Sequence, residues 1–538
     1  MWLSKDIQLR EIPIQTNSEG KPMQRRQFLR TTSAAIGAAM LPSWLAADSK
    51  SKPPNLIFIF ADQLRADALG YTGNTKAITP NIDTFASQSV QFSNAVSVMP
   101  VCAAYRASLL TGKYPSGHGM VINEVNMNPN HTTIAHVLKE AGYNLGYVGK
   151  WHLNDQHGRP TSRGAERLGF DGLWAAYSFN HSSYHSYYYT DAEDTELIKV
   201  TLEGKHGPTE FTDIAINYVD EAAKQDRPFA LFLSWNPPHD PWDRGNAPPT
   251  NYKRFEKVRF TLPENFVDTP DPYMDRYPGF AFNGQRAWKK EFLEEGLPEC
   301  LRCYYAMVNN LDEQFGRIMT KLDDVGISSN TVVVFTSDHG EMFGSQGRMF
   351  KLTFYDEAAR VPLLVRYPKN VRPGVSETCI NTPDIMPTLL GLMALKDELP
   401  GEVEGSDLSF ILRGEKGTEP EAAFLQGMGH TFQWMNGYEW RAVRDKRFTY
   451  AKYLRDGKEL LFDRKTDPFM KKDVSADPSY QQQLKHLRSY MTKKMTSLND
   501  EFRPCTWYRD HWMYKKYSVK TAAKGDFGPL PPIEPMRK

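Results

Sequence analysis

Short runs of consecutive apolar residues recur from residue 55 onward, and segments with apolar residues at helical spacing lie between them. The run at 55–60 is almost wholly apolar, which is typical of a strand covered on both faces of a sheet. The same pattern returns in four later runs, at 144–148, 229–233, 331–335 and 361–365. Helical spacing predicts helices over 133–141, 211–224 and 304–325. This alternation predicts an α/β fold, with a large, mainly parallel sheet flanked by helices.

The pattern changes near residue 400. A helical run at 384–393 is followed by 398–406, which is rich in Glu, Gly and Pro and is typical of a connection. Four short strand-like runs with turn residues between them then follow, at 422–425, 440–444, 448–453 and 459–462. A helix is predicted over 480–494. We therefore predict a large domain at 54–400 and a smaller C-terminal subdomain at 401–538, built from an antiparallel sheet plus a helix.

Residues 1–47 have the pattern of an export signal. The sequence Arg-Arg-Gln-Phe-Leu at 25–29 precedes an Ala-rich apolar stretch at 31–45, which leads into a small-residue cleavage site. Paired arginines in this position are typical of a twin-arginine signal peptide, and Met23 is a natural start, so residues 1–22 are an N-terminal extension. The apolar stretch is too short for a stable membrane span. The alternative is an ordinary amphipathic helix, and the favoured interpretation predicts an exported, periplasmic protein.

Charge narrows the classes of partner. The 538 residues include 65 Lys and Arg against 64 Asp and Glu, a formal net charge of +1. No long-range field therefore favours nucleic acid or an anionic membrane surface, so an anionic substrate requires a local cluster of positive charge.

Cysteine usage excludes a disulfide scaffold. The five cysteines are an odd number, so at least one thiol is unpaired. Cys300 and Cys303 are spaced as Cys-x-x-Cys, but no second pair completes a zinc site. Packing or a structural disulfide is the default interpretation of this pair, and a redox or metal function is the alternative. The pairing of Cys300, Cys303, Cys379 and Cys505 is left open.

Chemically active side chains follow four of the predicted strands. These strand-end groups are Asp62-Gln63, Lys150-Trp151-His152, Pro237-Pro238-His239 and Asp338-His339-Gly340. In a parallel sheet, ligands bind beyond the carboxyl ends of the strands, so these groups are expected to meet at one edge. Taken singly, each has an ordinary alternative: a helix cap for the aspartate, or a hydrogen-bonded structural role for each histidine. The joint pattern favours a site.

A further cluster begins at Cys102. Residues 102–110 are good helix formers closed by a glycine, so Cys102 is predicted in the first turn with Arg106 on the same face. The helix dipole and the guanidinium both favour an anion there. From these residues alone, a reactive thiolate and a buried structural cysteine both remain open.

The motif Cys102-Ala103-Ala104-Tyr105-Arg106, followed by Thr-Gly-Lys-Tyr-Pro at 111–115, resembles the signature of type I sulfatases. The resemblance runs from about residue 55 to residue 473. It includes the segments at 149–152, 238–241 and 337–340, Lys351, Thr-Pro-Asn at 79–81 and Asp-Pro at 467–468. In that family a dedicated maturation enzyme oxidises the cysteine to formylglycine, whose hydrate is the nucleophile.

The resemblance also implies a role for each matching residue. The metal ligands are Asp62, Gln63, Asp338, His339 and the modified Cys102, around one calcium ion. Arg106, Lys150 and Lys351 hold the charge of the sulfate. His239, with Lys351, protonates the departing alkoxide, and His152 takes the proton from the sulfated intermediate. Two positions depart from the frequent pattern: Gln63 replaces an aspartate and His339 an asparagine. The choice between calcium and magnesium is therefore left open.

The expected substrate is a sulfated polysaccharide or oligosaccharide. The aromatic-rich segment 174–189 has no clear period and is predicted to be a loop that binds a sugar through Asn180, His181 and His185. Aromatic packing under a long loop is the alternative for this segment. The segment 429–440 is expected to approach the same cleft from the smaller domain. Two other functions stay open: a phosphonate or phosphate-ester hydrolase, and a secreted glycan-binding protein with an unconverted Cys102.

Overall fold

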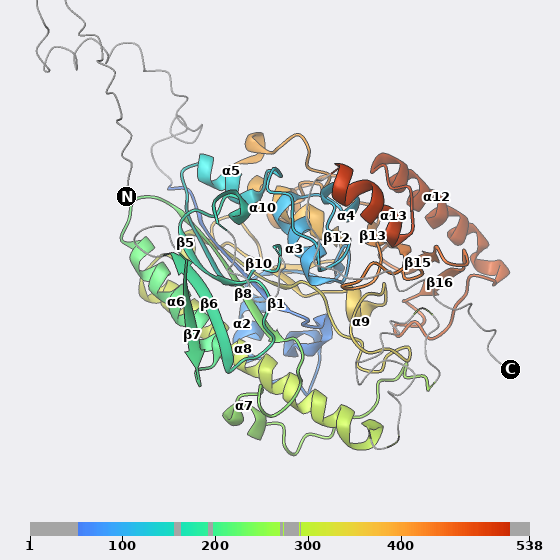
Figure 1. Cartoon of the computed structure of the whole chain (residues 1–538), viewed down its shortest axis with the longest axis horizontal. Coiled ribbons are helices and arrows are strands. Elements are labelled where there is room, and N and C mark those ends of the chain that lie inside the picture. The colour runs from blue at the N-terminus through green and yellow to red at the C-terminus, as the bar shows by residue number, and fades with distance from the viewer. Residues whose placement is uncertain are drawn as a thin grey trace, which may run out of the picture. The chain divides into compact units, whose positions relative to one another are not determined.

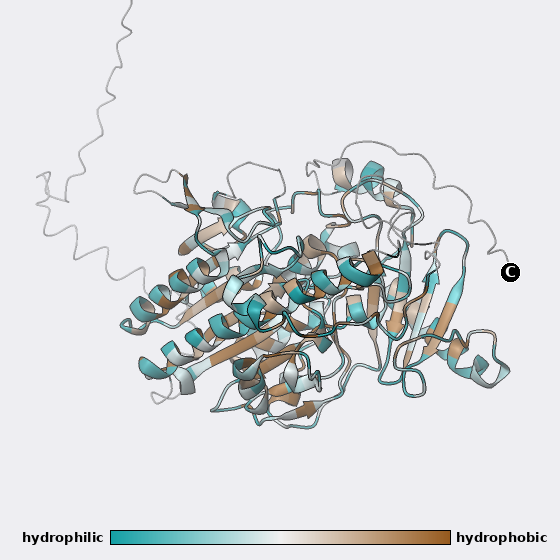
Figure 2. Cartoon of the chain, turned by 90° about the horizontal axis from the view of Figure 1, so that it is seen from below, coloured by the Kyte–Doolittle hydropathy of each residue, from teal (hydrophilic) through white to brown (hydrophobic). Residues whose placement is uncertain are grey.

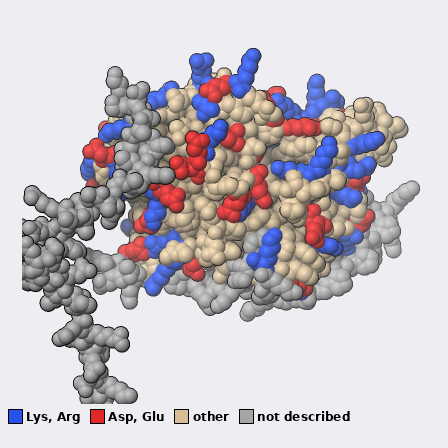
Figure 3. All heavy atoms as spheres, turned by 90° about the horizontal axis from the view of Figure 1, so that it is seen from above, with Lys and Arg blue, Asp and Glu red and all other residues tan. Residues whose placement is uncertain are grey.

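The computed structural model describes residues 52–154, 163–191, 197–268, 273, 290 and 292–516. The predicted signal peptide at 1–47 lies outside these residues. Across the ranges described, no helix combines the length and apolar character needed to cross a membrane. Lysine, arginine, aspartate and glutamate side chains intermingle on the face drawn in Figure 3, in keeping with the formal net charge of +1.

A ten-stranded sheet runs through the described part of the chain (Figure 1), in the order β11-β2-β10-β9-β1-β8-β4-β5-β6-β7. Its strands are β1 (Asn55–Asp62), β2 (Val90–Phe92), β4 (Asn144–Lys150), β5 (Leu173–Tyr177), β6 (His185–Asp191), β7 (Leu197–Glu203), β8 (Phe229–Pro238), β9 (Thr331–Ser337), β10 (Leu363–Arg366) and β11 (Gly374–Ser376). The central strands β9-β1-β8-β4-β5 are all parallel, so the predicted α/β architecture is confirmed. A small pair, β3 (Ala95–Val96) and β12 (Ile380–Asn381), lies apart from this sheet.

One predicted strand runs in the unexpected direction. The run at 361–365 forms β10, which pairs with β9 in antiparallel fashion. An apolar run does not encode strand direction, because a buried strand is apolar in either orientation. The consequence is functional: the connection from β9 to β10 leaves and returns at the carboxyl edge of β9. Lys351 lies on this connection and is therefore delivered to that edge.

Helices cover both faces of the large sheet (Figures 1 and 2). In β1, Leu56, Phe58 and Phe60 pack into one hydrophobic cluster, and the alternate residues pack into a second cluster on the opposite face. The first cluster includes α3 (Cys102–Thr111), α5 (Ile134–Glu140) and α10 (Thr382–Leu392), and the second includes α2 (Pro80–Ser87), α6 (Gly207–Ala223) and α8 (Leu297–Asp324). The shorter helices are α4 (Pro115–His118), α7 (Pro249–Lys253), α9 (Asp356–Ala359), α11 (Ser409–Leu412) and α13 (Cys505–Tyr508).

The aromatic segment 174–189 is not the single loop that the sequence predicted. It comprises most of β5, the connection 178–184 and the first five residues of β6. The antiparallel pairing of β6 with β7 spans seven residue pairs, from His185 with Glu203 to Asp191 with Leu197. This end of the sheet is only partly covered, so the tyrosines of β6 are half-buried. The sequence of β6 therefore lacks the alternation of apolar and polar residues that predicts a strand.

The C-terminal antiparallel sheet and its helix form as predicted. The sheet has the order β13-β14-β15-β16 and is antiparallel throughout. Its elements are β13 (Ala423–Gly427), β14 (Trp440–Arg444), β15 (Phe448–Tyr453), β16 (Glu459–Asp463) and the helix α12 (Gln481–Ser497). Phe424 and Leu484 belong to the same hydrophobic cluster as Leu56 of the large sheet. The domain division at residue 400 stays a prediction, since the two sheets share this core.

All five cysteines are buried and free. Cys300 and Cys303 lie in α8 and contribute to the hydrophobic cluster beneath β1. The pair therefore packs in the core and forms no disulfide, which agrees with the first of its two default interpretations.

Candidate active site

Two parallel strands carry carboxylates to the same edge of the sheet. Asp62 ends β1, where the register with β8 shifts, and Asp338 directly follows β9. The Asp338 N–H donates to Ala61 O at 3.2 Å, and Asp338 Oδ1 accepts from the Gln63 N–H at 3.0 Å. Both aspartates are completely buried. The strand ends thus place Asp62, Gln63 and Asp338 in direct contact.

The surrounding charges give the two carboxyl groups different proton affinities. Burial favours the neutral form of Asp62, but Lys150, His239 and Arg106 hold its pKa well below the usual range. Burial and the charge of Asp62 raise the pKa of Asp338 to about 7. Asp62 is therefore the firmly ionised member of the pair, and Asp338, buried beside its charge, is the more easily protonated one.

Cys102 lies in the first turn of α3, against these carboxylates. The Ala103 N–H donates to Asn123 Oδ1 at 3.0 Å, which satisfies one of the donors that a helix start leaves unpaired. Cys102 Sγ lies 3.2 Å from His339 Nε2 and 3.5 Å from Asp62 Oδ1. Burial, reinforced by the charge of Asp62, raises the pKa of Cys102 to about 11. The unmodified residue is therefore a thiol at neutral pH.

His339 presents a ligand nitrogen to the same point. Its Nδ1 lies 3.0 Å from Gly340 O, so Nδ1 carries the hydrogen and donates, and the lone pair of Nε2 faces the carboxylates. His339 Nε2 lies 3.6 Å from Oδ1 of both Asp62 and Asp338. The candidate ligand atoms of Asp62, Cys102, Asp338 and His339 all lie within 4.8 Å of one another. Two carboxylates and a correctly oriented imidazole fit a divalent cation.

Arg106 contacts both carboxylates, and Lys150 contacts that of Asp62. Arg106 Nη2 lies 3.1 Å from Asp62 Oδ2 and 3.2 Å from Asp338 Oδ2, so one guanidinium bridges both acids. Its Nη1 donates to Ser234 Oγ at 2.8 Å and to Lys150 O at 2.6 Å. Lys150 Nζ lies 2.5 Å from Asp62 Oδ2. The sequence assigned both cations to the sulfate, and in the structure their contacts orient the carboxylates.

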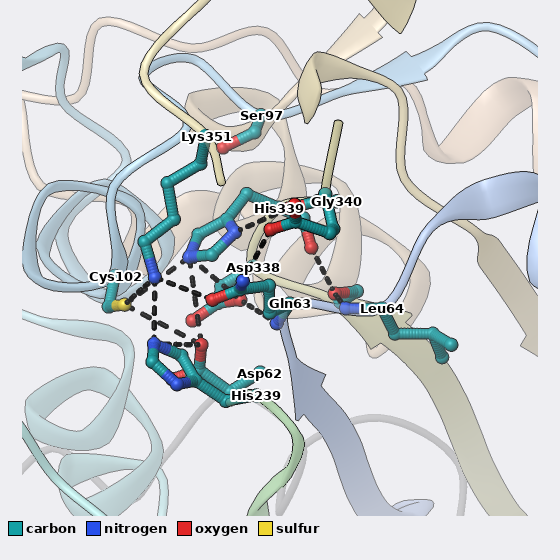
Figure 4. A network of polar contacts seen from close by, with 12 residues as sticks. Asp62, Gln63, Leu64, Ser97, Cys102, His239, Asp338, His339, Gly340 and Lys351 are labelled. Carbon is teal, nitrogen blue, oxygen red and sulfur yellow. Dashed lines mark hydrogen bonds and ion pairs between the residues drawn. The ribbon is translucent and has the colours of Figure 1, made fainter. Parts of the chain in front are cut away.

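Lys351 lies at the centre of the polar network (Figure 4). Its Nζ donates to Gln63 Oε1 at 2.7 Å and lies 3.6 Å from Cys102 Sγ. It also lies 2.8 Å from His239 Nε2, and since an ammonium only donates, His239 Nε2 accepts. His239 Nδ1 then donates to Asp240 O at 3.0 Å. Burial and the charge of Lys351 lower the pKa of His239 well below the usual range, so the shared proton resides on Lys351.

His152 is connected to His239 by a chain of ring contacts that runs through Phe179 and His181. Its backbone has a φ of 53°, in the left-handed region, directly after β4. The centroid distances are 5.3 Å from His152 to Phe179, 4.3 Å from Phe179 to His181 and 4.1 Å from His181 to His239. Burial, followed by the charge of Lys150, lowers the pKa of His152 well below the usual range. The two predicted acid–base histidines thus flank the ring pair formed by Phe179 and His181.

The three predicted sugar-binding residues occupy different environments. His181 lies against His239, as just described. Asn180 closes the turn between β5 and β6, because its side chain donates to His185 O at 3.1 Å and accepts from the Ser182 N–H at 3.0 Å. His185 is exposed at the start of β6. The structure therefore brings His181, of these three, into ring contact with a predicted catalytic residue.

The segment 429–440 reaches the site through one side-chain and one backbone hydrogen bond. Trp440 Nε1 donates to Leu352 O at 3.2 Å, next to Lys351, and Thr431 O accepts from the Asn123 N–H at 2.8 Å. Trp434 and Trp440 are 2% and 1% exposed, so neither ring forms an open wall for a ligand.

Four residues that support the site were not singled out from the sequence. They are Ser234, which anchors Arg106; Asp240, which accepts from His239; Phe179, in the ring chain; and Glu341, which accepts from Gln63 Nε2 at 2.6 Å. Asp240 and Glu341 each directly follow a strand-end motif, which is the signal that was available. Nothing in the sequence pattern distinguishes Ser234 from other buried strand residues.

Two family models match the chain: Sulfatase over residues 54–395, and N-sulphoglucosamine sulphohydrolase, C-terminal, over 344–498. The chain is 36% identical over 472 residues to an ulvan-active sulfatase of Formosa agariphila, covering 86% of this chain and 84% of that protein. It is 30% identical over 479 residues to an endo-4-O-sulfatase of Bacteroides thetaiotaomicron, covering 80% and 89%. The crystal structure of a putative sulfatase, yidJ, from Bacteroides fragilis superposes with a TM-score of 0.72 at 29% identity, covering 86% and 99%. The chain belongs to the sulfatase family and is a sulfuric ester hydrolase.

Proposed function

We propose that this enzyme hydrolyses sulfate esters of a polysaccharide or oligosaccharide, using formylglycine formed from Cys102 and one bound calcium ion. The observation that carries this proposal is the arrangement around Cys102. Three further cation-ligand side chains surround its Sγ, and the Lys351 ammonium lies 3.6 Å from it. Because burial raises the pKa of Cys102 to about 11, the thiol is not ionised at neutral pH and is a poor nucleophile. A formylglycine hydrate there supplies a nucleophilic hydroxyl next to a cation.

The cation would be held by Asp62, Asp338, His339 and the modified residue 102, with Gln63 beside them. When bound, it supplies Lewis-acid polarisation of the oxygens it contacts. Arg106 and Lys150 keep Asp62 ionised and fix the orientation of its carboxylate, as their contacts at 3.1 Å and 2.5 Å indicate. The mostly oxygen donor set favours calcium, and magnesium is the alternative that a competition experiment separates.

The balance of charge favours an anionic substrate. Three buried cations, Arg106, Lys150 and Lys351, face two buried aspartates, Asp62 and Asp338. With a divalent cation added, the site has a surplus of positive charge in surroundings that water does not screen. A sulfate ester provides the compensating negative charge, which a nearly neutral protein attracts only locally.

The proton for the leaving group is held by the pair Lys351 and His239. The ammonium of Lys351 donates to His239 Nε2 at 2.8 Å, and Asp240 O fixes the opposite ring nitrogen at 3.0 Å. This pair protonates the departing alkoxide. A neutral His152 then accepts the proton of the free hydroxyl on sulfated residue 102, the C–O bond to sulfate breaks, sulfate departs and the aldehyde re-forms. Burial keeps the pKa of His152 well below its usual range, which leaves the ring neutral and able to accept.

The carbohydrate class rests on the relatives and on the ring chain. The ulvan-active sulfatase and the endo-4-O-sulfatase support a sulfated polysaccharide or oligosaccharide. Phe179 and His181 present ring surface beside His239, which suits the flat face of a sugar. Asn180 and His185 stay proposed as outer contacts. We also propose that the protein is exported to the periplasm and that a separate maturation enzyme converts Cys102 to formylglycine.

Parallel kinetics test the reaction class. A sulfate monoester, a phosphate monoester and a phosphonate monoester of the same aryl alcohol are compared on the matured enzyme. We expect kcat/KM to be highest for the sulfate ester. A higher value for either phosphorus ester would replace the proposal with a phosphonate or phosphate-ester hydrolase. Binding of a sulfated glycan without turnover of any ester would replace it with an unconverted glycan-binding protein.

A further inference from the structure

Glu341 is a buried carboxyl that lies beside the site and has no part in the chemistry described above. It is 0% exposed and accepts three hydrogen bonds. Its Oε1 accepts from the Phe350 N–H at 2.6 Å and from the Phe343 N–H at 3.1 Å. Its Oε2 accepts from Gln63 Nε2 at 2.6 Å. One side chain therefore connects the end of β1 to the loop that carries Lys351.

These contacts fix which end of the Gln63 amide faces the site. A carboxylate only accepts hydrogen bonds and a lysine ammonium only donates them. Gln63 lies between the two, with Nε2 at 2.6 Å from Glu341 and Oε1 at 2.7 Å from Lys351. Both neighbours therefore require the same orientation, in which the amide oxygen points to the site and the NH₂ group points away. Among the described residues, Glu341 is the acceptor that Gln63 Nε2 contacts, so its loss removes what opposes a flipped amide at that end.

The three partners of Glu341 share a second property. Gln63, Phe343 and Phe350 all have positive φ values, 65°, 43° and 66°, although none is glycine. A non-glycine residue in this region is strained and persists only where its surroundings hold it. Each of these residues donates to the same carboxyl group. Glu341 is thus the common restraint on three strained residues that frame the site.

We propose that Glu341 is a positioning residue that aims the Gln63 oxygen at the cation site and holds the backbone in front of Lys351. Phe350 immediately precedes Lys351, so its N–H bond to Glu341 sets the direction from which the ammonium enters the site. This inference rests on the proposed cation site for its calcium readout only. The orientation of Gln63 and the strain at Phe343 and Phe350 do not depend on which ester the enzyme cleaves.

The proposal is tested by exchanging the glutamate at position 341 and the glutamine at position 63, first one and then both. In Glu341→Gln, the new amide oxygen must face the two backbone N–H donors, so its NH₂ group faces Gln63. Gln63 then either meets another donor or flips and turns its own NH₂ group toward the Lys351 ammonium. In the double variant Gln63→Glu with Glu341→Gln, a carboxylate at position 63 accepts from both neighbours. The double variant has the same net charge as the wild type, and every donor again faces an acceptor.

Calcium affinity is measured by calorimetry with CaCl₂ on matured, EDTA-stripped enzyme. Loss of a group that orients a ligand weakens metal binding by about 10–100-fold, and we expect this for Glu341→Gln. The double variant should recover affinity to within about fivefold of the wild type, since the hydrogen-bond pattern is restored. Thermal unfolding in EDTA gives a second readout without any metal. The midpoint should fall in the single variant and recover most of that loss in the double variant.

Asp384→Asn is the matched control. Asp384 is 6% exposed and accepts from the backbone N–H groups of Asn381 and Ser406, both at 2.8 Å, in α10. It should lower the unfolding midpoint without changing calcium affinity. The proposal is overturned if Glu341→Gln binds calcium as the wild type does, or if the double variant is no better than the single one. If the single variant does not fold, the double variant still decides: failure to fold or to bind calcium contradicts the proposal.

Discussion

The proton-donating pair makes a prediction that depends on the leaving group. His239→Ala removes the imidazole that accepts from Lys351 at 2.8 Å, and with it the fixed geometry of the ammonium. A sugar alkoxide is strongly basic and needs a proton as it departs, whereas a nitrophenolate departs without one. The variant is therefore expected to lose much more activity on a sulfated sugar than on a nitrophenyl sulfate.

The expected loss of activity on the sugar substrate follows from the usual contribution of a general acid. General acid catalysis by a positioned group contributes about 10²–10⁴-fold. At about 1.4 kcal/mol per tenfold change, this corresponds to roughly 3–5 kcal/mol in the barrier for the sugar substrate. We expect a loss below about tenfold for the nitrophenyl ester, since the acid contributes little there. Because His239 and Lys351 share one proton, the losses that His239→Ala and Lys351→Ala cause on the sugar substrate should not add up in the double variant.

The assay compares kcat/KM on the two substrates for each variant, with folding checked by thermal unfolding. His118→Ala is the matched control: His118 is also buried and its pKa is also lowered by burial, but it contacts Ser108, at 2.8 Å, and the Met120 N–H. It should reduce stability and affect both substrates equally. An equal loss on both substrates in His239→Ala would refute the role of His239 in leaving-group protonation.

Three further predictions concern stability and the cation. Arg441→Met should lower the free energy of unfolding by about 3–5 kcal/mol, because it leaves the buried Asp500 carboxylate without its partner; denaturant titration should show recovery in the double variant with Asp500→Leu. Gly149→Ala should reduce both stability and kcat/KM, because its Cβ meets Ser234 O at 2.0 Å and φ is 101°. Gly326→Ala has nothing within 4 Å of its Cβ but a φ of 71°, so it should lower stability through backbone strain alone and leave kcat/KM unchanged. EDTA should abolish turnover, and calcium at 100 times its Kd should both restore turnover and stabilise the fold by about 2.7 kcal/mol in a thermal shift assay; a fully active chelated enzyme would contradict the cation site.

The central strands were predictable because burial on both faces leaves a continuous apolar signal. That signal stops short of the observed strand ends. The run at 229–233 continues as β8 to Pro238, and β1 extends to Asp62. These extensions include the polar residues Asp62, Ser234 and Asn236, all of which are buried. The active-site residues therefore begin where the apolar run of each strand ends.

Other features depend on tertiary contacts that no local pattern encodes. The direction of β10 follows from its pairing with β9, and the pairing of β6 with β7 from a polar, half-exposed partner strand. The strand-end motifs indicated which residues meet, but not that Arg106 bridges two aspartates or that Glu341 accepts from Gln63. Those contacts require the connection after β9 to fold back over the carboxyl edge. Sequence thus predicts the composition of the site better than its internal bonding.

The state of residue 102 is the most direct test of the account. Mass spectrometry of the peptide containing Cys102, from enzyme produced in its native host, should show an aldehyde in place of the thiol. Activity should rise in proportion to the converted fraction, because the buried thiol itself does not cleave the ester. An enzyme that turns over sulfate esters while residue 102 is entirely unmodified would contradict the proposed mechanism.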